Sequence, residues 1–144
     1  MSTFKDWFDS QGIKHFGPGE FESYFAARRS GVKNSQPPRK LWPNILPTLR
    51  IVDELRESLG KPCRILSSYR SPDYNRAVGG ASRSQHLEFN ALDISFDGVS
   101  PRQVYERLLE WRKAGKFTGG LGLYPSSGFV HIDTRGSNAT WRGV

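Results

Sequence analysis

The sequence has few of the features that mark disulfide-rich, zinc-ribbon or membrane-spanning proteins. Cys63 is its single cysteine, which excludes a disulfide framework and a structural zinc site built from CxxC pairs. No run of about 18 apolar residues occurs, so no transmembrane helix is expected. Charged residues and glycine interrupt residues 1–30, which therefore contain no apolar signal-peptide core. The sequence shows no internal repeat, and its 144 residues are typical of one domain.

Positive charge exceeds negative charge, because 21 lysines and arginines outnumber 14 aspartates and glutamates and give a formal net charge of +7. Such an excess favours polyanionic partners, namely nucleic acid, anionic lipid or a bacterial wall polymer. The basic residues are scattered, however, and no RNA-binding or zinc-finger motif occurs. The simpler interpretation of the charge is a soluble protein with a basic surface. The nine Phe, five Tyr and four Trp are too many for a disordered chain, so a globular core is expected.

The N-terminal stretch has little regular pattern. Apolar residues at three- and four-residue steps predict a short helix over 18–29, and Gly31 is placed to end it. Two adjacent prolines then predict an extended connector. This stretch is too short for a separate domain. We therefore expect residues 1–144 to form one domain, on which an N-terminal extension of residues 1–40 packs.

Two longer helices follow from the spacing of apolar residues. The first is predicted over 44–59, where the apolar positions share one face and Gly60 is placed to end the helix. The second is predicted over 101–114. Ser100 can cap its first turn, and Gln103 completes a capping box.

Alternating apolar and polar residues predict strands over 63–67 and 90–96, and a β-hairpin with strands over 121–124 and 129–134. Two of these strands have an aliphatic face and a polar face. The long helices need an apolar surface to cover, and the aliphatic face of the sheet is the natural partner. The expected fold class is therefore α+β, an antiparallel sheet with helices packed on one face and a polar site on the other.

A histidine and two aspartates gather on the polar face, and a further histidine precedes them. His86 and Asp93 are seven residues apart, a rise of about 10.5 Å on a helix, and they would lie on opposite faces of one straight strand. They converge only if His86 lies in a loop before the strand, and the glycine-containing segment 79–85 supplies one. With His131 from a neighbouring strand they form a three-ligand set, which is typical of catalytic zinc. The alternative is a capping histidine, a solvated aspartate and a sheet-surface histidine.

Four segments then show a resemblance to a known family. Residues 84–93, SQHLEFNALD, resemble the S-x-H-x-x-G-x-A-x-D signature of the zinc D-alanyl-D-alanine carboxypeptidase family. That family includes bacterial D,D-peptidases and phage endolysins, and the hedgehog signalling domain shares its fold. Residues 67–75, 119–136 and 15–21 resemble further segments of the family, in order, so that the resemblance covers most of the chain.

The resemblance implies a zinc ion (Zn²⁺) bound by His86, Asp93 and His131 on the polar face of a hedgehog-like sheet. It also implies that Arg70 contacts the substrate or the developing oxyanion. A guanidinium beside the scissile carbonyl would stabilise the charge of the tetrahedral intermediate. Without the motif, Arg70 would be interpreted as a member of a surface ion pair.

Three further residues are candidates for substrate binding. Ser84 and Gln85 precede the first histidine of the motif, where they either order the ligand loop or hydrogen-bond the substrate. Tyr124 precedes the hairpin turn, where it either lines the cleft or packs.

The sequence departs from the family pattern at two positions. Phe89 stands where the motif has glycine, so the loop is expected to adjust. Gly128 stands three residues before the last histidine, where many members have an acidic general base. Asp133 is the expected substitute base, because it projects to the same face as His131; the alternative for Asp133 is to orient that histidine. Glu88 is the second choice as base.

These observations predict a zinc-dependent peptidase that cleaves a peptide bond in the peptidoglycan stem peptide, as a D,D- or L,D-type carboxypeptidase or endopeptidase. No carboxylate pair for glycan hydrolysis is evident. We expect a monomer that acts on the bacterial cell wall without membrane insertion or nucleic-acid binding. With no signal peptide, its release would need lysis or a pore, as for a phage endolysin. The alternatives are a non-catalytic wall-binding or assembly module that keeps the fold, and a basic nucleic-acid binder.

Overall fold

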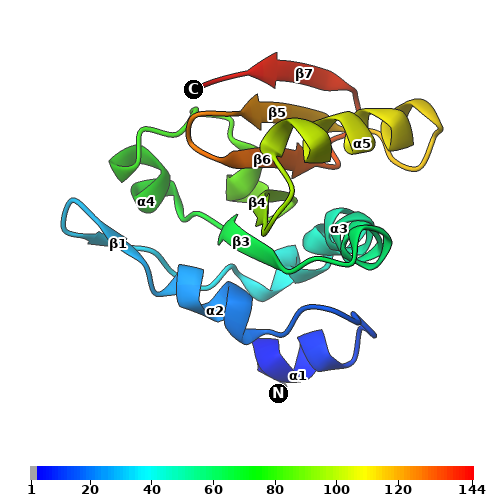
Figure 1. The fold of residues 1–144 in the computed structure, drawn as a ribbon. Helices are drawn as coiled ribbons and strands as arrows, with labels where there is room; N and C mark the ends of the chain where they lie inside the picture. The colour runs from blue at the N-terminus through cyan, green and yellow to red at the C-terminus, as the bar shows by residue number, and fades with distance from the viewer. Residues whose placement is uncertain (1–2) are drawn as a thin grey trace.

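A five-stranded sheet lies at the centre of the fold (Figure 1). The computed structural model describes residues 3–144. In spatial order the strands are β3 (Cys63–Ser67), β4 (Ala91–Phe96), β6 (Phe129–Asp133), β5 (Gly120–Tyr124) and β7 (Ala139–Arg142). The first four pair antiparallel, as the sequence predicts, whereas β7 pairs parallel to β5 and makes the sheet mixed. The sequence pattern did not predict β7, because this edge strand is short and only half-buried.

The α+β class is confirmed, and helices surround the sheet. They are α1 (Phe4–Asp9), α2 (Gly19–Phe25), α3 (Leu46–Leu59), α4 (Pro72–Ala77) and α5 (Pro101–Lys113), with the 3₁₀ helices η1 (Arg39–Ile45) and η2 (Gln85–Glu88). A short hairpin joins β1 (Arg28–Arg29) to β2 (Val32–Lys33).

The local signals of the two long helices are confirmed. Gly60 ends α3 in the left-handed region with a φ of 63°, and Ser100 and Gln103 form the predicted capping box of α5. The prediction of a helix over 18–29 is wrong at its C-terminal end. The helix α2 stops at Phe25, since the arginines that follow enter the β1–β2 hairpin.

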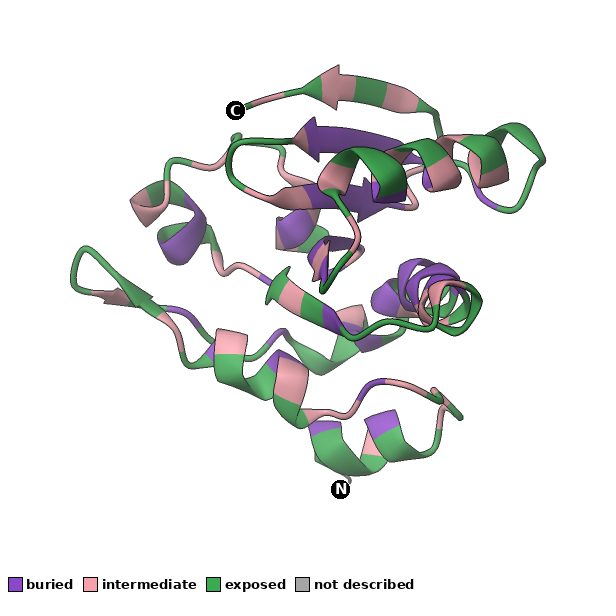
Figure 2. Cartoon of the chain, in the orientation of Figure 1, coloured by how far each residue is buried: buried purple, intermediate pink, exposed green. Residues whose placement is uncertain are grey.

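The aliphatic face of the sheet carries the core. Leu92, Ile132 and Leu121 lie side by side on β4, β6 and β5, and all three are fully buried. The helices α3 and α5 contact these strands, so they cover this face as expected. Figure 2 shows the burial along β5 and β6 and on α3, and the alternation of intermediate and exposed residues on β7.

The N-terminal segment packs into the same core through aromatic side chains. Phe4 contacts Phe21, Phe25, Trp42 and Phe89, with ring centroids 5.2–6.2 Å apart. The helix α1 was not predicted, although Thr3 caps its first turn in a capping box.

None of the helices between residues 3 and 144 combines the length and the hydrophobicity that crossing a membrane requires.

Candidate metal centre

One row of residues crosses all five strands on the face opposite the aliphatic core. Ser67, Asp93, His131, Gly122 and Trp141 are consecutive partners in this row. Period-two alternation turns Asp93 and His131 away from the helices and toward each other. His131 Nδ1 lies 3.0 Å from Asp93 Oδ1. The register of the sheet therefore brings together two of the three predicted ligands.

His86 reaches the same point from the helix η2, just before β4. Ser84 caps η2 by accepting a hydrogen bond from the backbone N–H of His86. The backbone N–H of Arg70 donates to the His86 carbonyl at 3.1 Å, which ties this turn to the segment after β3. His86 Nε2 then lies 3.2 Å from Asp93 Oδ2. The turn into the strand thus brings the two residues together as the sequence predicts.

The three side chains form a buried cluster whose donor atoms suit a metal ion. One donor atom from each of His86, Asp93 and His131 lies within 4.8 Å of the others. A tetrahedral zinc site with bonds of about 2.0–2.1 Å places neighbouring ligand atoms about 3.3 Å apart. His131 Nδ1 and His86 Nε2 each lie close to that distance from Asp93, at 3.0 Å from Oδ1 and at 3.2 Å from Oδ2 respectively. Within residues 3–144, this is the one group of histidine, cysteine and acidic side chains with such geometry.

Each histidine has an inner ring nitrogen, which faces the cluster, and an outer ring nitrogen, which has a partner of its own. His86 Nδ1 lies 2.6 Å from the Ser68 carbonyl oxygen, and His131 Nε2 lies 2.7 Å from Asp133 Oδ2. When each imidazole is neutral, these acceptors hold the outer N–H group and leave the lone pair of the inner nitrogen directed at the cluster. The ring tautomers thus fit a metal ion.

The electrostatics of the cluster keep its carboxylates ionised. Burial alone would raise the pKa of Asp93, but the charge of His86 and hydrogen bonds from both histidines hold that pKa below its ordinary value. Burial also opposes the ionised form of Asp133, yet hydrogen bonds from His131 and Arg135 lower its pKa. Burial works against the charged form of His131 as well, but its bonds to the two carboxylates raise its pKa. Two carboxylates therefore face the histidines as anions.

A hollow of about 440 Å³ opens beside the cluster. Ser84, Gln85 and Tyr124 line it, so these three candidates for substrate binding border the site. Asp93 is the only carboxylate among the lining residues in the described part of the chain. The cluster is therefore open to a ligand on one side.

Arg70 lines the same hollow, and three groups surround its guanidinium. Nε donates to the Tyr24 hydroxyl at 3.3 Å, and one terminal nitrogen donates to Asn75 Oδ1 at 3.3 Å. The other terminal nitrogen lies 3.7 Å from Asp93 Oδ2. The structure thus places Arg70 beside the candidate ligands and not in a surface ion pair.

Asp133 lies behind the cluster. It is completely buried, and its oxygens accept hydrogen bonds from the Gly120 N–H, the Arg135 N–H and the Arg135 guanidinium as well as from His131. It does not line the hollow. This geometry favours the second alternative for Asp133, the orientation of His131. Glu88 lines a separate hollow beside Asn44, away from the ligands.

Phe89, which stands at the glycine position of the family motif, lies at the C-terminal end of η2. Phe89 keeps a left-handed backbone, with a φ of 55°, as glycine would. Its ring is completely buried, and the rings of Phe21, Phe25 and Tyr69 lie 6.0–6.3 Å away. The N-terminal segment supplies part of the apolar pocket that this ring fills.

Several residues at the site were not predicted from the sequence, and Trp141 is the most important of them. Its indole N–H donates to the Tyr124 hydroxyl at 2.9 Å, and its ring lies 5.0 Å from His131. A Cβ at Gly122 would lie 2.4 Å from the Trp141 indole nitrogen, so a side chain at position 122 would collide with this ring. The sequence signal that could have identified it is the presence of a tryptophan in a short polar segment.

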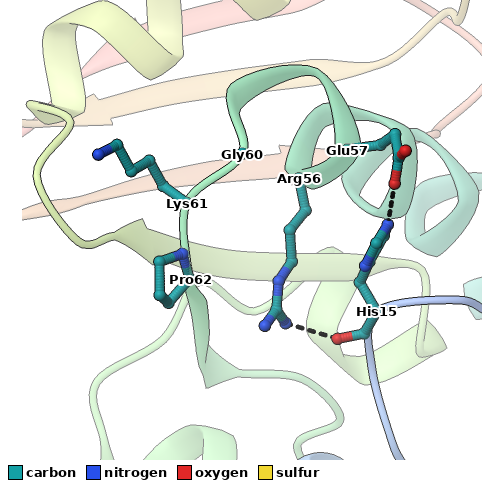
Figure 3. Close-up of a pocket in the computed structure, with 6 residues that line it drawn as sticks. All are labelled: His15, Arg56, Glu57, Gly60, Lys61 and Pro62. Atoms are coloured by element: carbon teal, nitrogen blue, oxygen red, sulfur yellow. Dashed lines mark hydrogen bonds and ion pairs between the residues drawn. The ribbon is translucent and has the colours of Figure 1, made fainter.

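A second hollow lies away from the cluster, where the N-terminal segment meets the C-terminal end of α3 (Figure 3). Arg56 donates to the His15 carbonyl oxygen, and the His15 imidazole pairs with Glu57. Asp53 accepts hydrogen bonds from the backbone N–H groups of Lys14 and His15. These contacts fasten the N-terminal segment to α3.

A buried His–Asp–His cluster that opens to a polar hollow on an α+β sheet is typical of metal-dependent hydrolases. The peptidase M15 family model matches residues 14–133, which include the whole cluster. The chain belongs to the peptidase M15 family.

The chain is similar in sequence to two proteins that are named as peptidoglycan endopeptidases. The chain is 38% identical over 79 residues to "Peptidoglycan L,D-endopeptidase MepK" of Escherichia coli K12, an alignment that covers 51% of this chain and 41% of the relative. It is 34% identical over 85 residues to "Probable peptidoglycan L,D-endopeptidase MepK" of Haemophilus influenzae, covering 56% and 42%. The chain thus spans about two fifths of the length of these relatives. No solved structure matches the chain.

Proposed function

We propose that this protein is a zinc-dependent peptidase that cleaves a peptide bond in the stem peptide of peptidoglycan. The observation that carries the proposal is the buried cluster of His86, Asp93 and His131, which opens to the hollow. Membership of the peptidase M15 family supports the class of reaction. The names of the two relatives support peptidoglycan as substrate and favour an L,D bond over a D,D bond.

Some residues of the site would bind the metal, and others would contact the substrate. Zinc held by His86, Asp93 and His131 would supply an activated water molecule and polarise the scissile carbonyl. Asp133 orients His131 and keeps its inner nitrogen directed at the metal position. Arg70 offers the terminal N–H group nearest Asp93 to the negative charge that develops on the carbonyl oxygen.

We assign the substrate contacts to the residues around the hollow. Ser84, Gln85, Tyr124 and Arg70 line it and present hydrogen-bonding groups. The net charge of +7 favours approach to an anionic wall. One chain holds all three ligands, so we expect a monomer to be sufficient for activity.

A non-catalytic wall-binding module is the second candidate. It is favoured by Gly128, which occupies the acidic position of many family members and has a φ of 84° in the turn between β5 and β6. A side chain at this φ would be strained, so the turn itself selects glycine. The hollow has no carboxylate besides Asp93 within the described residues.

Digestion of purified peptidoglycan by the zinc-loaded protein distinguishes the two candidates. We expect new amino groups, and fragments whose masses locate the cleaved bond in the stem peptide. His131→Ala should abolish cleavage and lower the bound zinc. The matched control His15→Ala removes a histidine from the second hollow and should retain cleavage. Binding to the wall polymer without any new amino groups would support the non-catalytic module, and full activity of the His131→Ala variant would refute the peptidase proposal.

A further inference from the structure

The helix α2 of the N-terminal segment contacts the site through one hydroxyl group. Tyr24 is half-buried near the end of α2, and its hydroxyl accepts the hydrogen bond from Arg70 Nε at 3.3 Å. Its ring meets the ring of Tyr74 edge-on, with centroids 5.8 Å apart, which limits the movement of the phenol. In Figure 1 the helix α2 lies alongside β3, the strand that leads into Arg70.

The Tyr24 hydroxyl completes a frame around the guanidinium. Asn75 Oδ1 accepts from one terminal nitrogen of Arg70, and Asn75 is itself fixed because its amide donates to the Ala81 carbonyl at 2.9 Å. With Nε bonded to Tyr24 and one terminal nitrogen bonded to Asn75, the other terminal nitrogen is the one that lies near Asp93, beside the hollow. Arginine carries several rotatable bonds, so that an acceptor on Nε selects one orientation of the planar group.

A buried asparagine links the position of Tyr24 to that of Arg70. The Asn34 amide nitrogen donates to the Tyr24 carbonyl at 3.0 Å and to the Tyr69 carbonyl at 2.8 Å. Its Oδ1 accepts from the Ser71 N–H at 2.9 Å. Asn34 is 3% exposed, and it therefore holds the backbone on both sides of Arg70 at a fixed distance from α2.

We propose that Tyr24 is a positioning residue for catalysis. Its hydroxyl fixes the Arg70 guanidinium in the orientation that meets the oxyanion, and Asn34 fixes the backbone that makes this contact. The proposal rests on the function proposed above for Arg70. It gives the N-terminal segment a part in the reaction that acts through Arg70, because preorganised donors stabilise developing charge better than mobile ones.

The kinetic test compares two Tyr→Phe variants. Tyr24→Phe removes only the hydroxyl, and we expect kcat/KM to fall about tenfold, mostly in kcat. Tyr105→Phe, on α5 away from the hollow, makes the same change and should leave both constants unaltered. In an Arg70→Ala background, Tyr24→Phe should have no further effect, because a positioning residue acts through its partner. An unaltered kcat/KM in Tyr24→Phe, or an equal loss in the Arg70→Ala background, would overturn the proposal.

The ¹H–¹⁵N signal of the Arg70 Nε–H provides a readout that needs no activity. It should shift and exchange faster with water in Tyr24→Phe, and remain as in the wild type in Tyr105→Phe. An unchanged Arg70 signal in Tyr24→Phe would overturn the positioning role. A zinc-loaded wild type that cleaves nothing would overturn the peptidase proposal instead, so the two failures are distinguishable.

Discussion

Phe89 combines a left-handed backbone with a completely buried ring. The left-handed region disfavours any side chain, by about 1 kcal/mol. Packing of the ring offsets this cost, since the ring contacts Tyr69 and aromatic residues of the N-terminal segment. Phenylalanine is therefore tolerated at a position where the family motif has glycine, because this chain provides a pocket for the ring.

Two variants separate these opposing effects at position 89. Phe89→Ala should lower the free energy of unfolding by about 3–5 kcal/mol, because a large cavity replaces the ring. Phe89→Gly should lower the free energy of unfolding by about 1 kcal/mol less than Phe89→Ala does, since glycine adopts the left-handed region without strain. Chemical denaturation measures both values. If the alanine variant proved the more stable of the two, the assignment of strain to this position would be wrong.

Cys63 is buried at the start of β3, and burial raises the pKa of its thiol to about 12 from an ordinary value of 9.0. At pH 8 its thiolate fraction is thus about a thousandfold below that of an exposed cysteine. We expect negligible reaction with a thiol reagent in the folded protein and rapid reaction in denaturant. Colorimetric titration of the thiol with and without denaturant measures this, and fast labelling of the folded chain would contradict the burial of Cys63.

At the scale of elements, the end of α3 shows a local signal that sequence analysis identified correctly. Gly60 adopts a φ of 63°, and a Cβ there would meet no atom within 4 Å. Gly60→Ala should therefore cost about 1 kcal/mol through backbone strain alone. The control Gly19→Ala, which lies in α2 without a positive φ and also has open space, should cost nothing. Thermal unfolding compares the two, and equal stabilities would contradict the strain at Gly60.

Elements that a short-range sequence pattern marks could be predicted from the sequence, whereas contacts between elements far apart in the sequence could not. The alternation in β4 and β6 predicted that Asp93 and His131 turn away from the aliphatic face, and the loop before β4 predicted the approach of His86. The strand β7 pairs in parallel with β5, which ends fifteen residues before β7 begins. No short-range pattern in the sequence therefore predicts this pairing. The contact of Tyr24 with Arg70 spans 46 residues and was equally invisible.

At the scale of the whole molecule, the candidate metal centre joins parts of the chain that are far apart in sequence. One ion would link η2, β4 and β6, and the segment that precedes η2 already bonds to the N-terminal residues through Asn34. We infer that residues 1–144 act as one domain, with the N-terminal extension as part of its core. The aromatic contacts of Phe4 support this inference.

Removal of zinc should therefore destabilise the whole chain. An ion present at about a thousand times its Kd stabilises the folded state by about 4 kcal/mol, which corresponds to a Tm higher by about 10 °C for a chain of this size. Differential scanning calorimetry with zinc and with a chelator measures the difference. The Asp93→Asn variant, which lacks one ligand charge, should show a much smaller response, and an equal response would mean that the ion binds elsewhere.

The central claim, that His86, Asp93 and His131 bind one zinc ion, is tested most directly by locating the ion itself. Anomalous diffraction at the zinc edge, from crystals of the zinc-loaded protein, measures its position and its distance to each ligand. We predict one peak within the cluster, about 2.0–2.2 Å from His86 Nε2, an Asp93 oxygen and His131 Nδ1. A peak elsewhere, or none at this cluster, would contradict the account.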